Sequence, residues 1–226
     1  GIFVSTYVGT NALASINIVY PIVNVLTGIA LVFATGGSSV TALYIGGNRK
    51  KEADRSFSAS SFAAILLGCL VSLMILTNLS AILTILGATP VTIAGCKTYA
   101  RWWLLATPVV IGKELFTYFI RVDGAPSYSF ITALSGGILN IVLDYILVGQ
   151  MQMGIYGAAL ATCISYIAVF MFRVFHTRKY IKYDIWYKEF ILGSLLMILS
   201  AILMFVDDIK GFLFQLLILV LGFAVF

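Results

Sequence analysis

A carboxylate and an amide in the apolar segment ITALSGGILNIVLDYILVG (131–149) are the side chains best placed for chemistry. Asp144 is the only charged residue between Gly124 and Phe172. A carboxylate at the centre of a membrane-spanning helix costs about 2.5–3.5 kcal/mol and usually serves an ion, a proton or a buried partner. Asn140 lies one helical turn away on the same face. The pair offers oxygen ligands to a small cation, or a proton site with a hydrogen-bonding neighbour.

A hydroxyl is predicted to join this pair from the next apolar segment. The turn GQMQMG (149–154) connects the two segments, and reflecting the sequence about it places Thr162 level with Asn140. We therefore predict a cation site for Na⁺ or H⁺, made by Asp144, Asn140 and Thr162, because hard cations take oxygen ligands. In the structural alternative, Asp144 caps a neighbouring helix or lies among headgroups, and Asn140 only joins helices.

The elements that position these side chains are predicted to be transmembrane helices. Hydrophobic residues make up 61% of the chain and charged residues 10%, with a mean hydropathy of +1.05. No Lys, Arg, Asp, Glu or His occurs in residues 1–48 or 56–95. A spanning helix needs about 20 apolar residues, whereas membrane strands alternate polar and apolar residues. The continuous apolar runs favour an all-α, polytopic transmembrane helix bundle.

Charge clusters divide the chain into seven predicted helices. They cover residues 12–46, 53–78, 92–122, 126–148, 154–175, 188–205 and 209–226. Residues 79–89 are predicted to be a short connection or an interfacial helix. Pro21 is predicted to kink the first helix, and Pro108 lies inside the third. We predict one lobe over residues 1–180, followed by two further membrane helices in residues 181–226.

Basic residues gather in every second loop. Ten of the fourteen Lys and Arg residues lie in three clusters, at 49–55, 121–123 and 173–188. The positive-inside rule places these clusters in the cytoplasm and the GQMQMG turn outside. Lys113 and Glu114 fall inside a predicted helix. Because adjacent helical residues point about 100° apart, they are not expected to pair side by side, but to snorkel to the cytoplasmic surface or contact other helices.

Other function classes lack their sequence signatures. We find no nucleophile–base set, no phosphate-binding glycine loop and no metal-spaced Cys/His set, so we expect no enzyme and no cofactor. No basic patch is interleaved with aromatic residues, so nucleic acid is not an expected partner. Cys69, Cys96 and Cys163 form no CxxC pair and are predicted to be small core residues.

Several segments carry a recognisable pattern: GIFVSTYVGTNALASINIVYPI, ATGGSSVTALYIGGNRKKEADRSFS, and FIRVDGAPSYSFITALSGGILNIVLDYIL followed by MGIYGAALATCISY. These segments resemble the multidrug and toxic-compound extrusion (MATE) transporters. The resemblance covers roughly residues 1–180 and implies one six-helix lobe, the N-terminal one. It also implies that Asn140, Asp144 and Thr162 match the cation-site positions of that lobe. The family's acidic residue in the first helix would precede Gly1, so the start of that helix is expected to be missing.

The last 46 residues instead resemble the final two helices of polysaccharide flippases of the same exporter superfamily. The expected function is cation-coupled antiport that exports amphipathic or cationic organic compounds across the cell membrane. The expected partners are the lipid bilayer, a small organic substrate, and a missing second lobe or a second copy of the chain. One alternative is a flippase for a lipid-linked oligosaccharide or polysaccharide precursor, whose cavity should need several basic residues. Another is a structural or non-functional membrane fragment.

Overall fold

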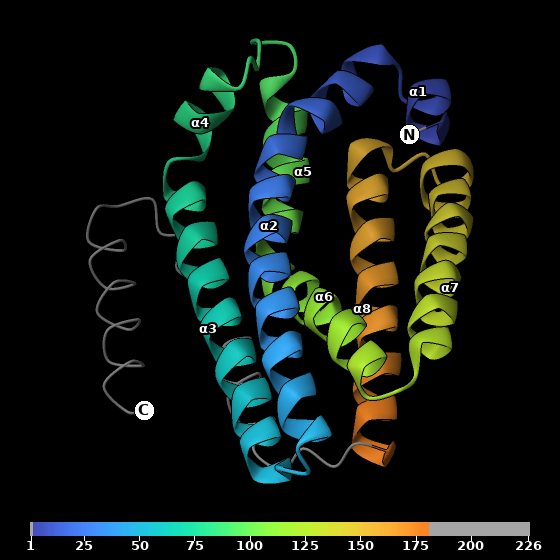
Figure 1. The fold of residues 1–226 in the computed structure, drawn as a ribbon. Coiled ribbons are helices and arrows are strands. Elements are labelled where there is room, and N and C mark those ends of the chain that lie inside the picture. Colours follow the sequence, from blue (N-terminus) through green and yellow to red (C-terminus); the bar gives the residue numbers. More distant parts are fainter. Residues whose placement is uncertain (1, 181–226) are drawn as a thin grey trace.

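The chain folds into a bundle of helices in a computed structural model that describes residues 2–180 (Figure 1). The elements are α1 (Ile2–Tyr7), α2 (Thr10–Gly46), α3 (Lys50–Thr77), α4 (Leu79–Ile85), α5 (Ile93–Leu105), α6 (Thr107–Val122), α7 (Pro126–Asp144), the π-helix η1 (Tyr145–Gln150) and α8 (Gly154–Tyr180). Regular secondary structure in this part is entirely helical, which confirms the predicted fold class. The predicted helices at 188–205 and 209–226 lie outside the described residues.

Four helices are long and apolar enough to cross a membrane. They are Thr10–Gly46, Lys50–Thr77, Pro126–Gln150 and Gly154–Thr177. Each corresponds to a predicted helix, with ends that differ by a few residues. The segment at 79–89, predicted to be a short connection or an interfacial helix, contains the helix α4. Pro21 lies inside α2 as predicted, and Figure 1 shows the N-terminal turns of α2 leaning towards α1.

The predicted single helix at 92–122 is in fact two helices. α5 and α6 meet at a break around Ala106 and are bent by 55°, so together they make one broken span. Pro108 lies in the first turn of α6, where its missing N–H costs no helical hydrogen bond. The proline therefore begins a new helix rather than kinking a continuous one. The bend turns α6 behind α2 and towards α8, as Figure 1 shows.

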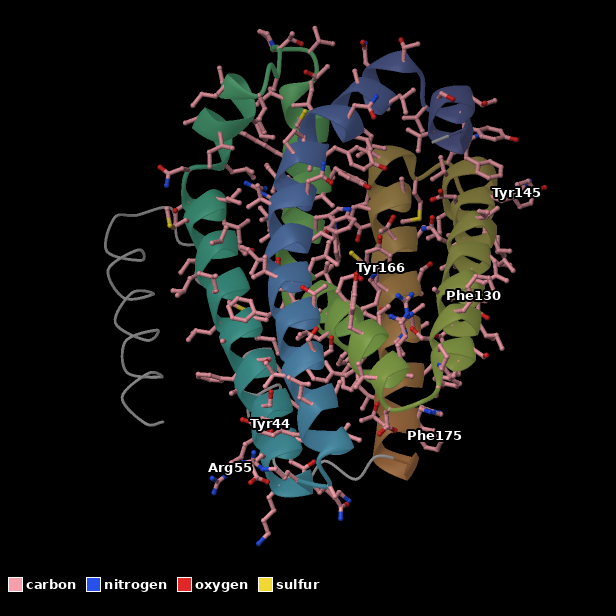
Figure 2. All side chains as sticks on the ribbon, in the orientation of Figure 1. Tyr44, Arg55, Phe130, Tyr145, Tyr166 and Phe175 are labelled. Atoms are coloured by element: carbon pink, nitrogen blue, oxygen red, sulfur yellow. The ribbon has the colours of Figure 1, made fainter. Side chains whose placement is uncertain are left out.

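The connections with clustered basic residues lie at one end of the bundle, as the loop charges predict. Figure 1 shows the α2–α3 turn, the α6–α7 connection and the end of α8 at one end of the bundle. The α7–α8 connection and α1 lie at the opposite end. Arg55 projects at the first of these ends in Figure 2. The alternation of basic and non-basic connections between two ends is thus present, whereas the cytoplasmic assignment stays a prediction.

Close approach of α7 to α8 builds the region around the predicted site. Gly136 on α7 faces Val169 on α8 so closely that an added Cβ would lie 2.2 Å from Val169 Cγ2. Small residues at such contacts let helix backbones pack together in a membrane. The α6–α7 connection contains Gly124 with φ +91°, a conformation that side chains rarely adopt, and Pro126 then starts α7.

Candidate functional site

A partly open cavity of about 450 Å³ lies between helices α1, α2, α5, α6, α7 and α8. Its charged lining residues are Lys113, Glu114, Asp144 and Arg173, which makes two basic and two acidic groups. The other lining residues are Val4, Ile16, Tyr20, Tyr99, Trp103, Thr117, Ala133, Gly136, Gly137, Asn140, Ala158, Thr162, Tyr166 and Val169. The cavity thus combines balanced charges with an aromatic and apolar wall.

The three predicted cation ligands all line this cavity. Asn140 Nδ2 donates to Thr162 Oγ1 over 3.4 Å, and Thr162 Oγ1 in turn donates to the carbonyl of Ala158 over 3.0 Å. Asp144 Oδ1 is buried and has no hydrogen-bond partner among the described residues. The structure therefore brings Asn140 and Thr162 into contact between α7 and α8, as the reflection about the turn predicts, and Asp144 lies on the wall of the same cavity. Within residues 2–180, Asp144 Oδ1 makes no helix-capping bond.

Asp144 lies where α7 changes its winding. The α-helix ends at Asp144, and the six residues of η1 continue it as a π-helix, in which Met151 N donates to the carbonyl of Ile146 over 2.8 Å. π-Helical turns are rare and occur frequently at functional sites. The uninterrupted hydrophobic pattern of this segment contains no signal for such a change.

Lys113 and Glu114 also line the cavity, and Lys113 contacts α8, which agrees with the expected alternative of contact with other helices and contradicts snorkelling. They form a salt bridge with each other, and both side chains are less than one-fifth exposed. The argument that adjacent helical residues diverge was wrong here, because the long Lys113 side chain bends back to its neighbour. The Lys113 ammonium also lies 4.6 Å from the centre of the Tyr166 ring, a distance typical of cation–π contacts. Lys113 therefore faces the interior instead of snorkelling.

Arg173 was assigned to a basic loop, and the structure corrects this. Its side chain is 1% exposed and ties α8 to two other helices. Arg173 Nη1 donates to the carbonyl of Lys113 over 2.7 Å and to Thr117 Oγ1. Nε donates to Thr132 Oγ1 over 3.0 Å, and Nη2 donates to the carbonyl of Ser129 over 3.1 Å. All three nitrogen atoms of the guanidinium thus donate to uncharged oxygen atoms.

Aromatic residues complete the wall opposite α7. The Tyr166 ring packs edge-on against the Trp103 ring, with centroids 5.4 Å apart, and Tyr166 lies centrally in Figure 2. Tyr99 and Trp103 are buried, whereas Tyr20 is half exposed. Such a wall suits a flat, apolar molecule.

Metal-binding clusters are absent from the described part of the chain, where no three His, Cys, Asp or Glu residues gather. Cys69, Cys96 and Cys163 are buried and free, as predicted for small core residues. The cation site proposed from the sequence is thus of the oxygen-ligand type, with one carboxylate.

A sequence profile described as MatE matches residues 1–146. The chain belongs to the MATE family. Multidrug export protein MepA of Staphylococcus aureus (strain NCTC 8325 / PS 47) is 30% identical over 177 residues, which cover 78% of this chain and 39% of MepA. MepA of Staphylococcus saprophyticus is 31% identical over 171 residues, or 75% of this chain and 38% of the relative. The chain thus spans about two fifths of the length of these relatives.

Solved MATE structures have the same fold. A crystal structure of a MATE protein in complex with MaL6 gives a TM-score of 0.76 at 25% identity, over 91% of this chain and 49% of that one. An outward-facing multidrug resistance MATE transporter gives a TM-score of 0.73 at 24% identity, and the match covers 90% of this chain and 49% of that one. Together with the apolar helices, these likenesses show a multi-pass membrane protein that corresponds to the N-terminal lobe of the MATE fold.

Proposed function

We propose that this chain is the cation-coupled lobe of an exporter for amphipathic or cationic organic compounds. The coupling ion, Na⁺ or H⁺, binds at Asp144 with Asn140 and Thr162. The observation that carries the proposal is the buried Asp144 Oδ1, which lacks a hydrogen-bond partner among the described residues yet lines the same cavity as the other two. The Asp144 side chain as a whole is only partly buried. Burying one of its carboxylate oxygens without a partner still costs free energy, and a bound proton or cation reduces that cost.

Charge balance in the cavity supports antiport. Lys113 and Arg173 balance Glu114 and Asp144, so a cation bound at Asp144 leaves one net positive charge in the cavity. This charge opposes the entry of a cationic substrate, because charges in a partly buried site interact strongly. Binding of the ion and binding of the substrate then weaken each other, as exchange of one for the other requires.

A second lobe is part of the proposal. In transporters built from repeats, the substrate site lies between two units that move against each other. Curated relatives named as multidrug export proteins are more than twice as long as the matched region. We propose that a second lobe, or a second copy of this chain, closes the transport pathway opposite the cavity.

The flippase alternative has weaker support from the cavity. A lipid-linked pyrophosphate needs several free basic groups. The two basic groups of the cavity are balanced by two acidic groups, and Arg173 is already held by carbonyl and hydroxyl oxygens.

The test is ion-gradient-driven export of a fluorescent cationic dye from vesicles that contain the chain together with its second lobe or second copy. Asp144→Asn keeps the side-chain shape and removes the charge, so export should vanish while the protein level stays unchanged. Thr162→Ala should reduce export less, because it removes one neutral ligand. Separate Na⁺ and pH gradients identify the coupling ion.

Asp123→Asn is the matched control, because it removes the same charge at the α6–α7 connection, outside the spans. Partial burial raises the pKa of Asp123, against the opposing effect of His176 and Lys50. Asp123→Asn should therefore export the dye at a rate close to that of the wild type. Export by Asp144→Asn at the wild-type rate would refute the proposed coupling site.

A further inference from the structure

We propose that Glu114 and Tyr166 form the subsite that receives the positive charge of the exported compound. In this proposal the Lys113 ammonium occupies the subsite while no substrate is bound. The inference rests on the proposed export function for its substrate class, an organic cation with flat aromatic rings. It adds a binding site for the substrate charge that is separate from the Asp144 site.

The contacts of Lys113 are those that a bound organic cation would make. Its ammonium pairs with the Glu114 carboxylate and lies 4.6 Å from the centre of the Tyr166 ring. A carboxylate beside an aromatic face is a general arrangement for recognising ligand ammonium groups. All three residues line the cavity, so a ligand there has access to the same carboxylate and ring.

The surroundings of this subsite fit the rest of such a molecule. Trp103 packs edge-on against Tyr166, and Tyr99 also lines the cavity, which makes an apolar aromatic wall beside the carboxylate. A cavity of about 450 Å³ is large enough for a drug-sized molecule. A cation with aromatic rings would thus place its charge at Glu114 and its rings along the wall.

The two basic residues of the cavity differ in how they are held. Arg173 is fixed by bonds to α6 and α7, through Lys113, Thr117, Ser129 and Thr132. The Lys113 ammonium is attached to its backbone by a flexible four-carbon stem, which can carry it away from Glu114. Lys113 is therefore the displaceable cation, and Arg173 is part of the frame.

The experiment measures equilibrium binding of tetraphenylphosphonium to the purified full chain in nanodiscs, without an ion gradient. Lys113→Met should tighten binding about fivefold or more, and Glu114→Gln should weaken it by a similar factor, the lower end of ordinary coupling between sites. Lys51→Met is the control, because it removes an equal charge from an exposed position at the basic end. Neutral triphenylphosphine oxide should bind with the same affinity to all of these variants.

The double variant Lys113→Met/Glu114→Gln separates competition from a general change in charge. If Lys113 competes for Glu114, the double variant should bind like Glu114→Gln alone. If Lys113→Met tightens binding equally in both backgrounds, or does not tighten it at all, the proposal is overturned.

A second pair of variants keeps the test decisive if Glu114→Gln does not fold. Tyr166→Phe retains the aromatic face and should bind tetraphenylphosphonium like the wild type, whereas Tyr166→Leu should bind it more weakly. Equal binding by these two variants overturns the proposal. The binding assay uses no ion gradient, so it tests the Glu114–Tyr166 subsite separately from export. Loss of the expected binding pattern with persistent Asp144-dependent export would overturn only the subsite, and the opposite result would overturn only the coupling site.

Discussion

Replacing Arg173 tests whether a buried guanidinium holds the lobe together. Its four hydrogen bonds join α8 to α6 and α7 at the side of the cavity, and its side chain is 1% exposed. Arg173→Met keeps the length and most of the volume of the side chain but removes every donor. The variant should insert and fold, with a less stable contact among these three helices.

The expected loss of stability follows from the number and kind of these bonds. Hydrogen bonds between membrane helices contribute about 0.6 kcal/mol on average, so four of them amount to about 2.4 kcal/mol. Removing one partner of a buried charged pair costs about 3–5 kcal/mol, because the other charge is left alone. That larger figure does not apply, since Thr117 and Thr132 are neutral and their hydroxyls also donate to helix carbonyls. We therefore expect a loss of about 2–3 kcal/mol.

The measurement is reversible unfolding of the purified chain in mixed micelles with increasing sodium dodecyl sulfate, followed by circular dichroism. Arg121→Met is the control, because Arg121 is exposed and close to the ring of Tyr118, 5.5 Å away. It should change stability by less than about 0.5 kcal/mol. If Arg173→Met unfolds at the same detergent fraction as the wild type, the guanidinium network does not stabilise the lobe.

Two further outcomes are expected. Gly37→Ala should destabilise the α2–α3 contact by about 1–3 kcal/mol, because its methyl would lie 2.5 Å from the Cβ of Ser60. Gly36→Ala, which meets no atom within 4 Å, should be nearly neutral in the same unfolding assay, and equal effects would contradict the packing argument. Cysteines introduced at Arg49 and Met151 should react with membrane-impermeant reagents from opposite sides of the membrane, with Arg49 on the cytoplasmic side. Labelling from the same side would disprove the predicted topology.

Much of the lobe is predictable from the sequence because its signals are local. Continuous apolar runs fix the long helices, and clusters of basic residues mark the connections at one end of the bundle. The hairpin of α7 and α8 has a short turn, so reflection about it is enough to bring Thr162 to Asn140, which the 3.4 Å contact confirms. The role of these residues in ion binding stays a prediction.

Two features depend on three-dimensional context and escaped prediction. The break between α5 and α6 needs the neighbouring helices to accept a bend of 55°, and Pro108 is equally compatible with a kink or a new start. The change from α7 to η1 leaves the hydrophobic pattern intact, so periodicity cannot reveal it.

The basic residues of the cavity were not predicted because charges were grouped by their position in the sequence and not by which helices face each other. Arg173 lies just before a cluster of basic residues, so it looked like the first member of a loop. The predicted helix at 154–175 already contains Arg173, but its charge was counted with the cluster that follows. In the structure Arg173 lies inside α8, which continues to Tyr180, and its side chain is buried. A useful sign was present on the facing helices, where Thr117, Ser129 and Thr132 place hydroxyl groups in predicted membrane segments. Hydroxyls that gather on neighbouring membrane helices need a polar partner, and the nearest unassigned basic residue at that depth is the one to examine.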